Sequence, residues 1–287
     1  MPTTNPRTLR LGLLHPGEMG ASVGAAAHQA GARVAWASTG RSDESRRRAA
    51  LAGLEDLISL EELAATSDVI LSVCPPDAAV ALAESVAATG FAGIYVDANA
   101  VSTGTAHRVA DIIEGCGARF VDGGIIGPPA HGPGTTRLYL SGAEAAAVAD
   151  VFDGSALQAI AMDTRPGAAS ALKMCYAAWT KGSAAMLTGI RALALAEGVE
   201  GALLEEWALS QKGLEARSTG AARNNAFKAW RFAGEMREIA ATFEASELPG
   251  GFHRAAADIY ERLSAYKDCD PPPELAELME TILDNRT

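Results

Sequence analysis

The two halves of this chain carry different patterns of apolar residues, and this contrast limits the folds that the chain can adopt. In the first half, short apolar runs alternate with longer, alanine-rich helical patterns. Parallel strands need a crossover segment between them, usually a helix, so the alternation predicts an α/β domain built on a parallel sheet. The predicted strands are Leu9–Leu14, Arg33–Ala37, Val69–Val73, Gly93–Val96, Arg119–Val121, Leu138–Leu140 and Gln158–Ala161.

The second half contains no apolar run that predicts a strand. Residues Gly167–Ala196 lack proline and predict one long helix, and the helical patterns after it break at Ser218–Gly220, Leu248–Gly251 and Asp270–Pro273. We therefore predict two domains: an α/β domain over residues 1–163, and an all-α domain over residues 164–287 that begins with the long interdomain helix.

Charge and composition exclude several classes of protein. The chain has 24 Lys+Arg against 35 Asp+Glu, a formal net charge of −11, whereas nucleic-acid-binding and membrane-surface proteins rely on clustered cations. No apolar run reaches the roughly 20 residues of a membrane helix. The four cysteines and five histidines show no metal-ligand spacing. These features predict a cytoplasmic globular protein that binds no nucleic acid, membrane or metal.

A glycine-containing turn follows the first predicted strand and opens the first helix, where a dinucleotide-binding turn would lie. Gly17 would let a pyrophosphate approach the N–H groups of the helix, and Gly20 would let the helix pack closely. His15 replaces the usual first glycine of GxGxxG, so an ordinary glycine-rich loop is the alternative. The predicted cofactor-binding residues here are His15, Pro16, Gly17, Glu18, Met19 and Gly20.

The residues after the second predicted strand indicate which dinucleotide binds. An NAD site places a carboxylate there for the ribose 2′-hydroxyl, but no carboxylate occurs before Asp43. Instead the strand is followed by Ser38, Thr39 and Arg41, whose hydroxyls and guanidinium suit a 2′-phosphate. We therefore predict NADP over NAD. Alternatively, Arg41 only begins a solvated charged run on the next helix.

These motifs resemble the 6-phosphogluconate dehydrogenase and β-hydroxyacid dehydrogenase superfamily. The opening Gly12-Leu-Leu-His-Pro-Gly-Glu-Met-Gly20 is similar to that superfamily's first turn. The resemblance continues through Ser67–Pro75, Val96-Asp97 and Phe120-Val-Asp122, and it reaches Gly167-Ala-Ala-Ser-Ala-Leu-Lys173, which is similar to the catalytic helix. The helical C-terminus resembles a less characterised branch with its own C-terminal domain.

The resemblance implies a Rossmann-type first domain, an active site between the domains and a homodimer built around the helical domains. It places Val73, Cys74 and Pro75 among the cofactor-binding residues. Asn99, in the Asp97-Ala-Asn-Ala100 segment, would help to position the cofactor or the substrate.

Several positions depart from the β-hydroxyacid dehydrogenase pattern. Where an S-G-G turn would hold a substrate carboxylate, this chain has Ile125-Ile-Gly-Pro-Pro129, so a hydroxyl and one backbone donor are missing. The Asn expected one helical turn after the lysine is Ala177, beside Tyr176. These changes favour a larger or less anionic substrate. We expect Ile126 and Gly127 to contact it.

Lys173 interrupts an apolar helical run, and a buried ammonium is costly unless it is paired or used. Tyr176 and Thr180 lie on the same helical face, with Lys181 at its edge, so Thr180 and Lys181 are predicted substrate residues. Lys173 and Tyr176 are predicted to be catalytic, with Asn99 assisting. The alternative is a lysine whose ammonium simply reaches water.

The sequence thus predicts an NADPH-dependent oxidoreductase acting on a small carbonyl or hydroxy compound, with Lys173 as the proton donor or acceptor. Imine reductases are relatives that usually carry Asp or Tyr at the lysine position, so imine reduction on the same scaffold is one alternative. A non-catalytic dinucleotide-binding protein is another.

Overall fold

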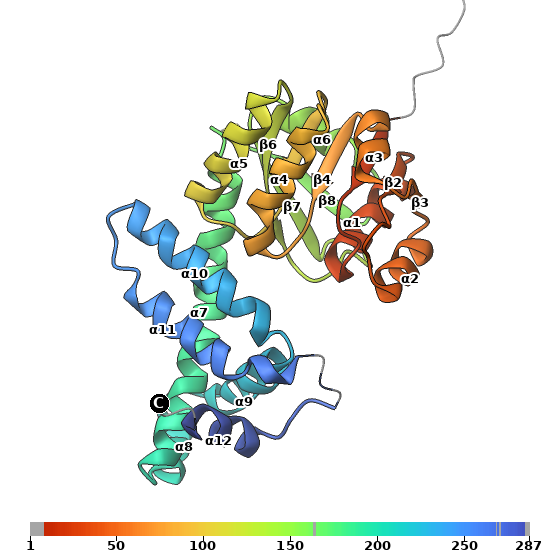
Figure 1. Cartoon of the computed structure of the whole chain (residues 1–287). Helices are drawn as coiled ribbons and strands as arrows, with labels where there is room; N and C mark the ends of the chain where they lie inside the picture. Colours follow the sequence, from red (N-terminus) through yellow and green to blue (C-terminus); the bar gives the residue numbers. More distant parts are fainter. Residues whose placement is uncertain (1–8, 163–164, 268, 270, 285–287) are drawn as a thin grey trace, which may run out of the picture. The chain divides into compact units, whose positions relative to one another are not determined.

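The structure, a computed structural model, describes residues 9–162, 165–267, 269 and 271–284 (Figure 1). The chain divides into two compact units, residues 1–173 and 174–287, and the division falls inside helix α7 (Ala168–Ala196). This helix confirms the long helix predicted from residue 167 to residue 196. The predicted domain boundary between residues 163 and 164 lies outside the described residues, so it stays a prediction.

The first unit is built on one eight-stranded sheet of order β3-β2-β1-β4-β5-β6-β7-β8. Its neighbouring strands are parallel except for β6 and β7, which are antiparallel. The sheet is therefore mostly parallel, as the alternating sequence pattern predicts. The strands are β1 (Arg10–Leu13), β2 (Arg33–Trp36), β3 (Glu55–Asp56), β4 (Val69–Ser72), β5 (Ile94–Asp97), β6 (Arg119–Ile126), β7 (Thr136–Ser141) and β8 (Leu157–Ala161).

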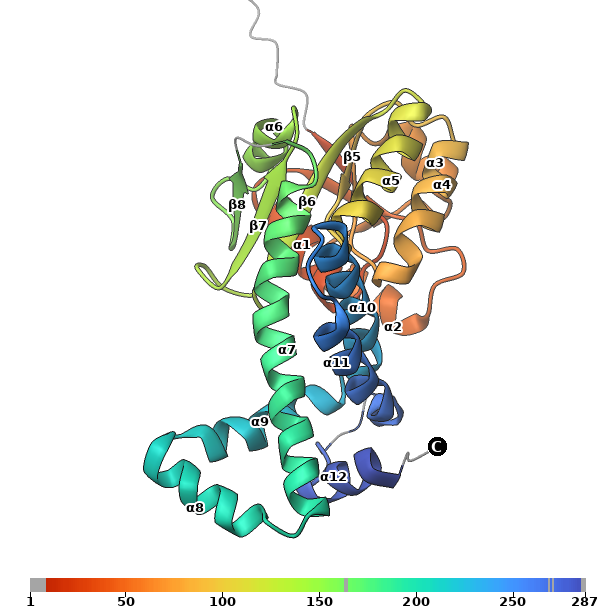
Figure 2. The same ribbon diagram turned by 90° about the vertical axis from the view of Figure 1, so that its left-hand side faces the viewer.

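Helices cover both faces of this sheet (Figure 2). Alternate side chains of each strand point to opposite faces, so two separate cores form. Leu11, Leu13 and Leu71 pack with α1 (Glu18–Gln29), α2 (Asp43–Leu51) and α6 (Ala145–Asp150). On the other face, Ile70, Tyr95 and Phe120 pack with α3 (Leu60–Thr66), α4 (Ala79–Ala88) and α5 (Thr103–Gly115). Burial of these apolar strands on both faces is typical of parallel sheets.

Serine caps define where three of these helices begin. The hydroxyls of Ser42, Ser59 and Ser102 accept hydrogen bonds from the backbone N–H groups of Ser45, Glu62 and Thr105, respectively. Each bond satisfies an N–H group that has no partner within its helix.

The second unit is helical, as predicted. The helices after α7 are α8 (Glu200–Ser210), α9 (Leu214–Ala226), α10 (Ala229–Ala245), α11 (Gly251–Arg262) and α12 (Leu275–Asp284). Polar contacts join several of these helices to α7. Arg191 of α7 binds Glu200 of α8 and the Ser218 hydroxyl of α9. Tyr260 of α11 donates a hydrogen bond to the Lys181 carbonyl of α7.

The predicted break at Ser218–Gly220 is wrong, because α9 continues through it. Ser218 is buried, donates back to the Glu215 carbonyl and accepts from Arg191, so its hydroxyl does not compete with the helix. The other two predicted breaks are confirmed: α10 ends before Leu248, and α12 begins after Pro273. No helix among the described residues has the length and apolar character to cross a membrane.

Candidate functional site

The strand order places five predicted site segments at one edge of the sheet. The carboxyl ends of parallel strands share an edge, and β1, β2, β4, β5 and β6 are consecutive neighbours there. The chain moves from β1 outward to β2, then returns to the other side of β1 with β4. Such a switch in strand order is where doubly wound sheets bind ligands, at the carboxyl ends of the strands.

The first turn has the open backbone that a pyrophosphate requires. Among the described residues, no atom lies within 4 Å of the place that a Cβ on Gly17 would take, and no side chain caps the α1 N-terminus. A side chain at Gly20, in contrast, would collide with the His15 carbonyl oxygen. Gly20 thus lets the turn fold tightly against the helix, and Gly17 leaves the helix N–H groups accessible to an anion. Glu18 is exposed in the first turn of α1, Met19 is half-buried and Pro16 is buried.

His15 contacts Arg41, which the sequence pattern does not indicate. The Arg41 Nη1 lies 2.5 Å from the His15 Nε2 and donates to it. Burial, reinforced by the Arg41 charge, lowers the pKa of His15 to about 4, so its imidazole is neutral at pH 7. Because Nε2 accepts a hydrogen bond, the proton of this neutral ring lies on Nδ1.

Two N–H groups of this pair lack partners. The His15 Nδ1 and the Arg41 Nε are buried and have no hydrogen-bond partner among the described residues. Burial also lowers the pKa of Arg41 below its usual range, because the charged guanidinium is partly removed from solvent. A partly buried cation with unsatisfied N–H groups fits an anionic ligand. The residues present therefore fit a phosphate group.

The rest of the loop after β2 supports Arg41. The Ser38 carbonyl accepts hydrogen bonds from the Arg41 N–H and from the Arg46 guanidinium. Ser38 is buried, whereas Thr39 is exposed and donates its N–H to Ile58. Between Thr39 and Arg41, the chain turns at Gly40 with a φ of +73°, a conformation that favours glycine.

Asn99 positions the loop after β4. Its Oδ1 accepts from the Cys74 N–H at 2.5 Å, its Nδ2 donates to the Ser72 hydroxyl, and its N–H donates to Asp97. Both polar atoms of the amide are therefore engaged within the protein. The loop that it holds contains the predicted residues Val73, Cys74 and Pro75. Burial, with the charge of Asp97, raises the pKa of Cys74 to about 12, so this thiol is no nucleophile.

Asp122 anchors the start of α7 to the sheet. Its carboxylate accepts hydrogen bonds from the Ser170 N–H and hydroxyl and from the Ser141 hydroxyl, and all three residues are buried. The Ser141 hydroxyl also accepts from the Ala169 N–H. A carboxylate at a helix N-terminus satisfies free N–H groups and complements the helix dipole. Sequence reasoning missed Ser141 and Ser170, since they lie 19 and 48 residues from Asp122.

The anchored helix brings Lys173 onto β6. The Lys173 Nζ donates to the Ile125 carbonyl oxygen at 2.6 Å. This approach depends on Gly124, because a Cβ there would lie 2.6 Å from the Ala169 carbonyl oxygen and 3.1 Å from the Lys173 Cβ. The lysine is half-buried and hydrogen-bonded at the carboxyl end of β6. Its environment differs from that of a lysine extended into water.

The predicted substrate turn follows directly after Ile125. Ile126 is buried, so its side chain is in the protein interior. Gly127 is exposed with a φ of +128°, and a side chain there would collide with the Thr135 carbonyl. The Ala130 N–H donates to the Ser22 hydroxyl of α1, which ties the turn to the first helix. Of these two predicted residues, Gly127 is the accessible one.

The remaining predicted residues belong to the helical unit. Tyr176 and Thr180 are exposed on α7, and the Thr180 hydroxyl donates to the Tyr176 carbonyl. Lys181 is largely buried and forms a 2.6 Å ion pair with Glu235 of α10. Its Nζ also lies over the Phe232 ring, 5.0 Å from the ring centroid. The structure therefore brings His15 to Arg41, Cys74 to Asn99 and Lys173 to Ile125, and it places Lys181 in a structural ion pair.

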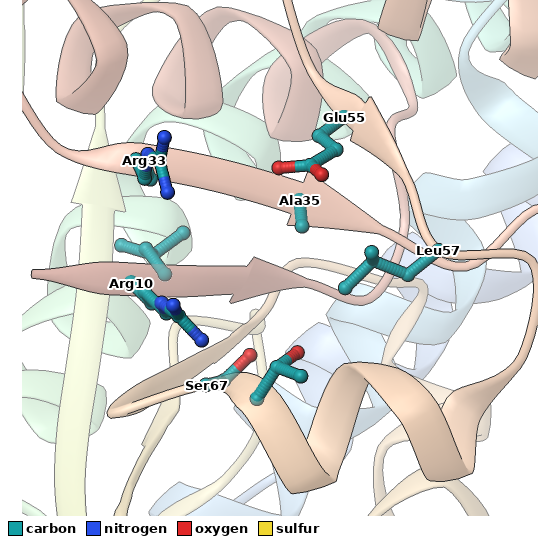
Figure 3. A pocket seen from close by; sticks show the side chains of 8 residues that line it. Arg10, Arg33, Ala35, Glu55, Leu57 and Ser67 are labelled. Atoms are coloured by element: carbon teal, nitrogen blue, oxygen red, sulfur yellow. The ribbon is translucent and has the colours of Figure 1, made fainter.

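A small cavity lies beside β1, β2 and β3 (Figure 3). It has a volume of about 130 Å³, with Arg10 and Arg33 at one end and Glu55 and Leu57 at the other. None of the predicted site residues lines this cavity, so it is separate from the candidate site.

Comparison with known families decides the identity of the first unit. Residues 10–168, more than half of the chain, match the family described as the NAD binding domain of 6-phosphogluconate dehydrogenase. The chain belongs to this family. Residues 194–263 match a domain of unknown function, DUF1932. The 6-phosphogluconate dehydrogenase-type domain confirms the resemblance predicted from the sequence motifs.

One curated relative is an uncharacterised 28.5 kDa protein of Methanothermus fervidus, 29% identical over 166 residues. The match spans 58% of this chain and 63% of the length of the relative. Among solved structures, MTH1747, a protein of unknown function with structural similarity to 3-hydroxyacid dehydrogenases, is 25% identical. The match covers 90% of this chain and 98% of that chain, with a TM-score of 0.66.

More distant structures share the fold. Mycobacterium tuberculosis 3-hydroxyisobutyrate dehydrogenase is 20% identical, with a TM-score of 0.67 over 98% of this chain and 100% of that chain. A reductive aminase from Aspergillus terreus is 16% identical, with a TM-score of 0.56 over 95% of this chain and 99% of that chain. The fold is therefore that of the hydroxyacid dehydrogenases, with imine-reducing enzymes among its relatives.

Proposed function

We propose that this protein is an NADPH-dependent oxidoreductase that reduces a carbonyl group, or oxidises the corresponding hydroxyl, of a small organic substrate. The observation that carries the proposal is the contact between His15 and Arg41. It holds a guanidinium beside the glycine turn of a dinucleotide-binding domain. The loop after β2 is where such domains distinguish the 2′-hydroxyl of NAD from the 2′-phosphate of NADP.

Each part of the cofactor would have its own residues. The N–H groups at the start of α1 would hold the pyrophosphate beside Gly17. Arg41, with Ser38 and Thr39, would hold the 2′-phosphate, because a guanidinium offers several N–H donors to phosphate oxygens. The backbone of Val73, Cys74 and Pro75, fixed by Asn99, would border the nicotinamide side. Bound NADPH supplies a hydride to the carbonyl carbon.

Lys173 is the proposed proton donor and acceptor. In the direction of reduction, its ammonium would hydrogen-bond to the substrate carbonyl oxygen and give it a proton; in oxidation, the neutral amine would take the hydroxyl proton. The Ile125 carbonyl holds its Nζ in position beforehand. Gly127 and Tyr176, with Thr180, are the proposed substrate contacts, and Tyr176 would add a donor. Lys181 would act only indirectly, through its ion pair.

Imine reduction is the second candidate function, favoured by a specific likeness. A reductive aminase shares the fold over 95% of this chain, and its structure contains NADPH4 with cyclohexanone and allyl amine. Reduction of an imine needs a proton donor for its nitrogen, and because imine reductases usually carry Asp or Tyr at the lysine position, Tyr176 is the proposed donor in this case. A screen of cyclic imines beside ketones distinguishes the two. A protein that binds NADPH but turns over neither would be a non-catalytic dinucleotide-binding protein.

We also propose a homodimer formed through the helical unit. Trp179, Met186 and Leu193 are exposed on α7 at seven-residue intervals, so they line one side of the helix. Exposed apolar stripes of this kind mark interaction surfaces. A second copy of the same helix would cover the stripe.

The test is a binding titration of NADPH and NADH on wild type and on an Arg41→Leu variant. Charge-assisted hydrogen bonds contribute about 1.5–3 kcal/mol, so wild type should bind NADPH about tenfold to hundredfold more tightly than the variant does. NADH should bind both proteins equally. Arg47→Leu, which removes an exposed arginine of α2, is the matched control and should bind as wild type. Equal affinity of wild type for NADH and NADPH would contradict the proposal.

A further inference from the structure

The contact between His15 and Arg41 leaves donor groups of both side chains unsatisfied. The Arg41 guanidinium donates to the His15 imidazole at 2.5 Å. The His15 Nδ1 and the Arg41 Nε are both buried, however, and have no partner among the described residues. The two side chains come from separate loops, after β1 and after β2. Together they present donors beside the open end of α1, where Gly17 leaves space.

His15 occupies this position without backbone strain. The non-glycine residues with positive φ, among those described, are Ile58 and Glu247, so His15 has an ordinary backbone conformation. A glycine there is therefore not needed for the turn itself. The imidazole instead fills the position from which it reaches Arg41.

We propose that His15 is a second residue that selects NADPH: binding of the 2′-phosphate places a dianion against the pair, and His15 then takes a proton from solvent. The neutral ring would otherwise present only one N–H to the phosphate. After protonation, both ring nitrogens donate, one to the phosphate and the other to a second oxygen or solvent, while Arg41 turns its donors from the ring to the phosphate. The proton returns to solvent when the cofactor leaves. This inference rests on the proposed NADPH function.

The charges around His15 determine whether cofactor binding raises or lowers its pKa. In the free protein, burial and, to a smaller extent, the positive charge of Arg41 disfavour the imidazolium and lower the pKa of His15 to about 4. Cys74, from the loop after β4, faces Arg41 and stays a neutral thiol at pH 7, because its pKa is about 12. Glu18, at the start of α1, is exposed. A bound dianion reverses the local charge and raises the pKa of His15.

Protonation of His15 can be measured directly on the full chain. Carbon-13 and nitrogen-15 labelling of histidine allows each ring to be followed by NMR between pH 3.5 and pH 8, without cofactor, with NADPH and with NADH. A His15→Gln variant assigns the His15 signal, and exposed His28, at the far end of α1, is an internal control. We expect the His15 midpoint near pH 4 in the free protein and above pH 6 with NADPH. With NADH it should stay near pH 4.

Calorimetry gives an independent readout. NADPH is titrated at pH 6 in two buffers of different ionisation enthalpy, which yields the number of protons taken up on binding. Wild type should take up about half a proton or more beyond the value for His15→Gln, whose amide can accept from Arg41 but cannot gain charge. The variant also cancels any proton that the phosphate itself releases.

The outcomes separate this inference from the proposed function. If NADPH binds and the His15 midpoint does not move, the proton-linked role is wrong and the cofactor assignment stands. If NADH raises the midpoint as far as NADPH does, the 2′-phosphate is not the trigger and the inference is again overturned. If NADPH does not bind at all, the proposed function fails, and the inference fails with it.

Discussion

Lys173 lies where three backbone features converge. Gly124 has no side chain to hold α7 away from β6, the Ile125 carbonyl accepts from the Nζ, and the substrate turn at Gly127 follows two residues later. The Ile125 carbonyl therefore helps to orient the ammonium at the carboxyl end of β6.

Replacing Lys173 tests its role in proton transfer. Lys173→Met keeps most of the aliphatic stem and removes the amine. General acid–base catalysis typically contributes 10²–10⁴-fold, so we expect turnover to fall by about that factor while the Kd for NADPH changes less than threefold. Steady-state kinetics with the substrate found by screening, together with a binding titration, provides both values. Unchanged turnover would exclude Lys173 from the chemistry.

His15 and Arg41 show why part of the site escapes sequence reasoning. Each residue is recognisable alone, because each stands in a loop that a dinucleotide-binding pattern identifies. Their contact spans 26 residues and depends on the adjacency of β1 and β2. Asn99 is a similar case: the pattern predicts its location, but only the fold shows that its amide binds the Cys74 N–H and the Ser72 hydroxyl at the end of β4.

At the scale of elements, α7 is held to the sheet by a buried carboxylate. Asp122 accepts three hydrogen bonds from Ser141 and Ser170 and thereby caps the helix. Breaking a buried hydrogen-bonded network leaves each donor unsatisfied, which costs about 1–3 kcal/mol per group. The position of Lys173 on α7 therefore depends on Asp122 of β6, which lies far from Lys173 in the sequence.

An Asp122→Ala variant tests this anchor. We expect the free energy of unfolding to fall by about 3 kcal/mol, since at least two buried donors lose their acceptor. Urea denaturation followed by circular dichroism measures the change. Asp111→Ala, at an exposed position on α5, is the control and should change stability by less than about 0.5 kcal/mol. A loss as small as that of the control would show that the network is dispensable.

Whether a strand or helix can be predicted from the sequence depends on how its residues are buried. Strands such as β4 and β5 are buried on both faces and therefore appear as apolar runs. The strand β3 consists of Glu55 and Asp56, both exposed, so no apolar pattern indicates it. In α9, Ser218 resembles a helix breaker until its buried partner Arg191, 27 residues away, is known.

At the scale of the whole molecule, the helical unit leaves the apolar stripe of α7 exposed. Trp179 is 63% exposed and Leu193 is 60% exposed, and the Arg217 guanidinium lies over the Trp179 ring. Large apolar side chains that recur along one helix face are costly in water. Covering them in a dimer would remove that cost.

A charged substitution in the apolar stripe of α7 tests the proposed dimer. Leu193→Lys should weaken dimerisation at least about tenfold, because an interface core that loses an apolar side chain and buries a charge loses more than 1.4 kcal/mol. Analytical ultracentrifugation over a range of concentrations measures the dimer Kd. Leu51→Lys, at a 76% exposed leucine of α2, is the matched control and should leave the dimer intact. A wild type that sediments as a monomer would contradict the proposal.

The anchor at Asp122 and Ser170 also sets the rotational phase of α7. Each residue of a helix turns the next side chain by about 100° and raises it by about 1.5 Å. One residue inserted before Ala168 can be absorbed by the preceding loop. One residue inserted between Ser170 and Lys173 would swing the amine about a quarter turn away from the Ile125 carbonyl, although every side chain of the site would still be present. The count of residues between the anchor and the lysine is thus as much a part of the site as the lysine itself.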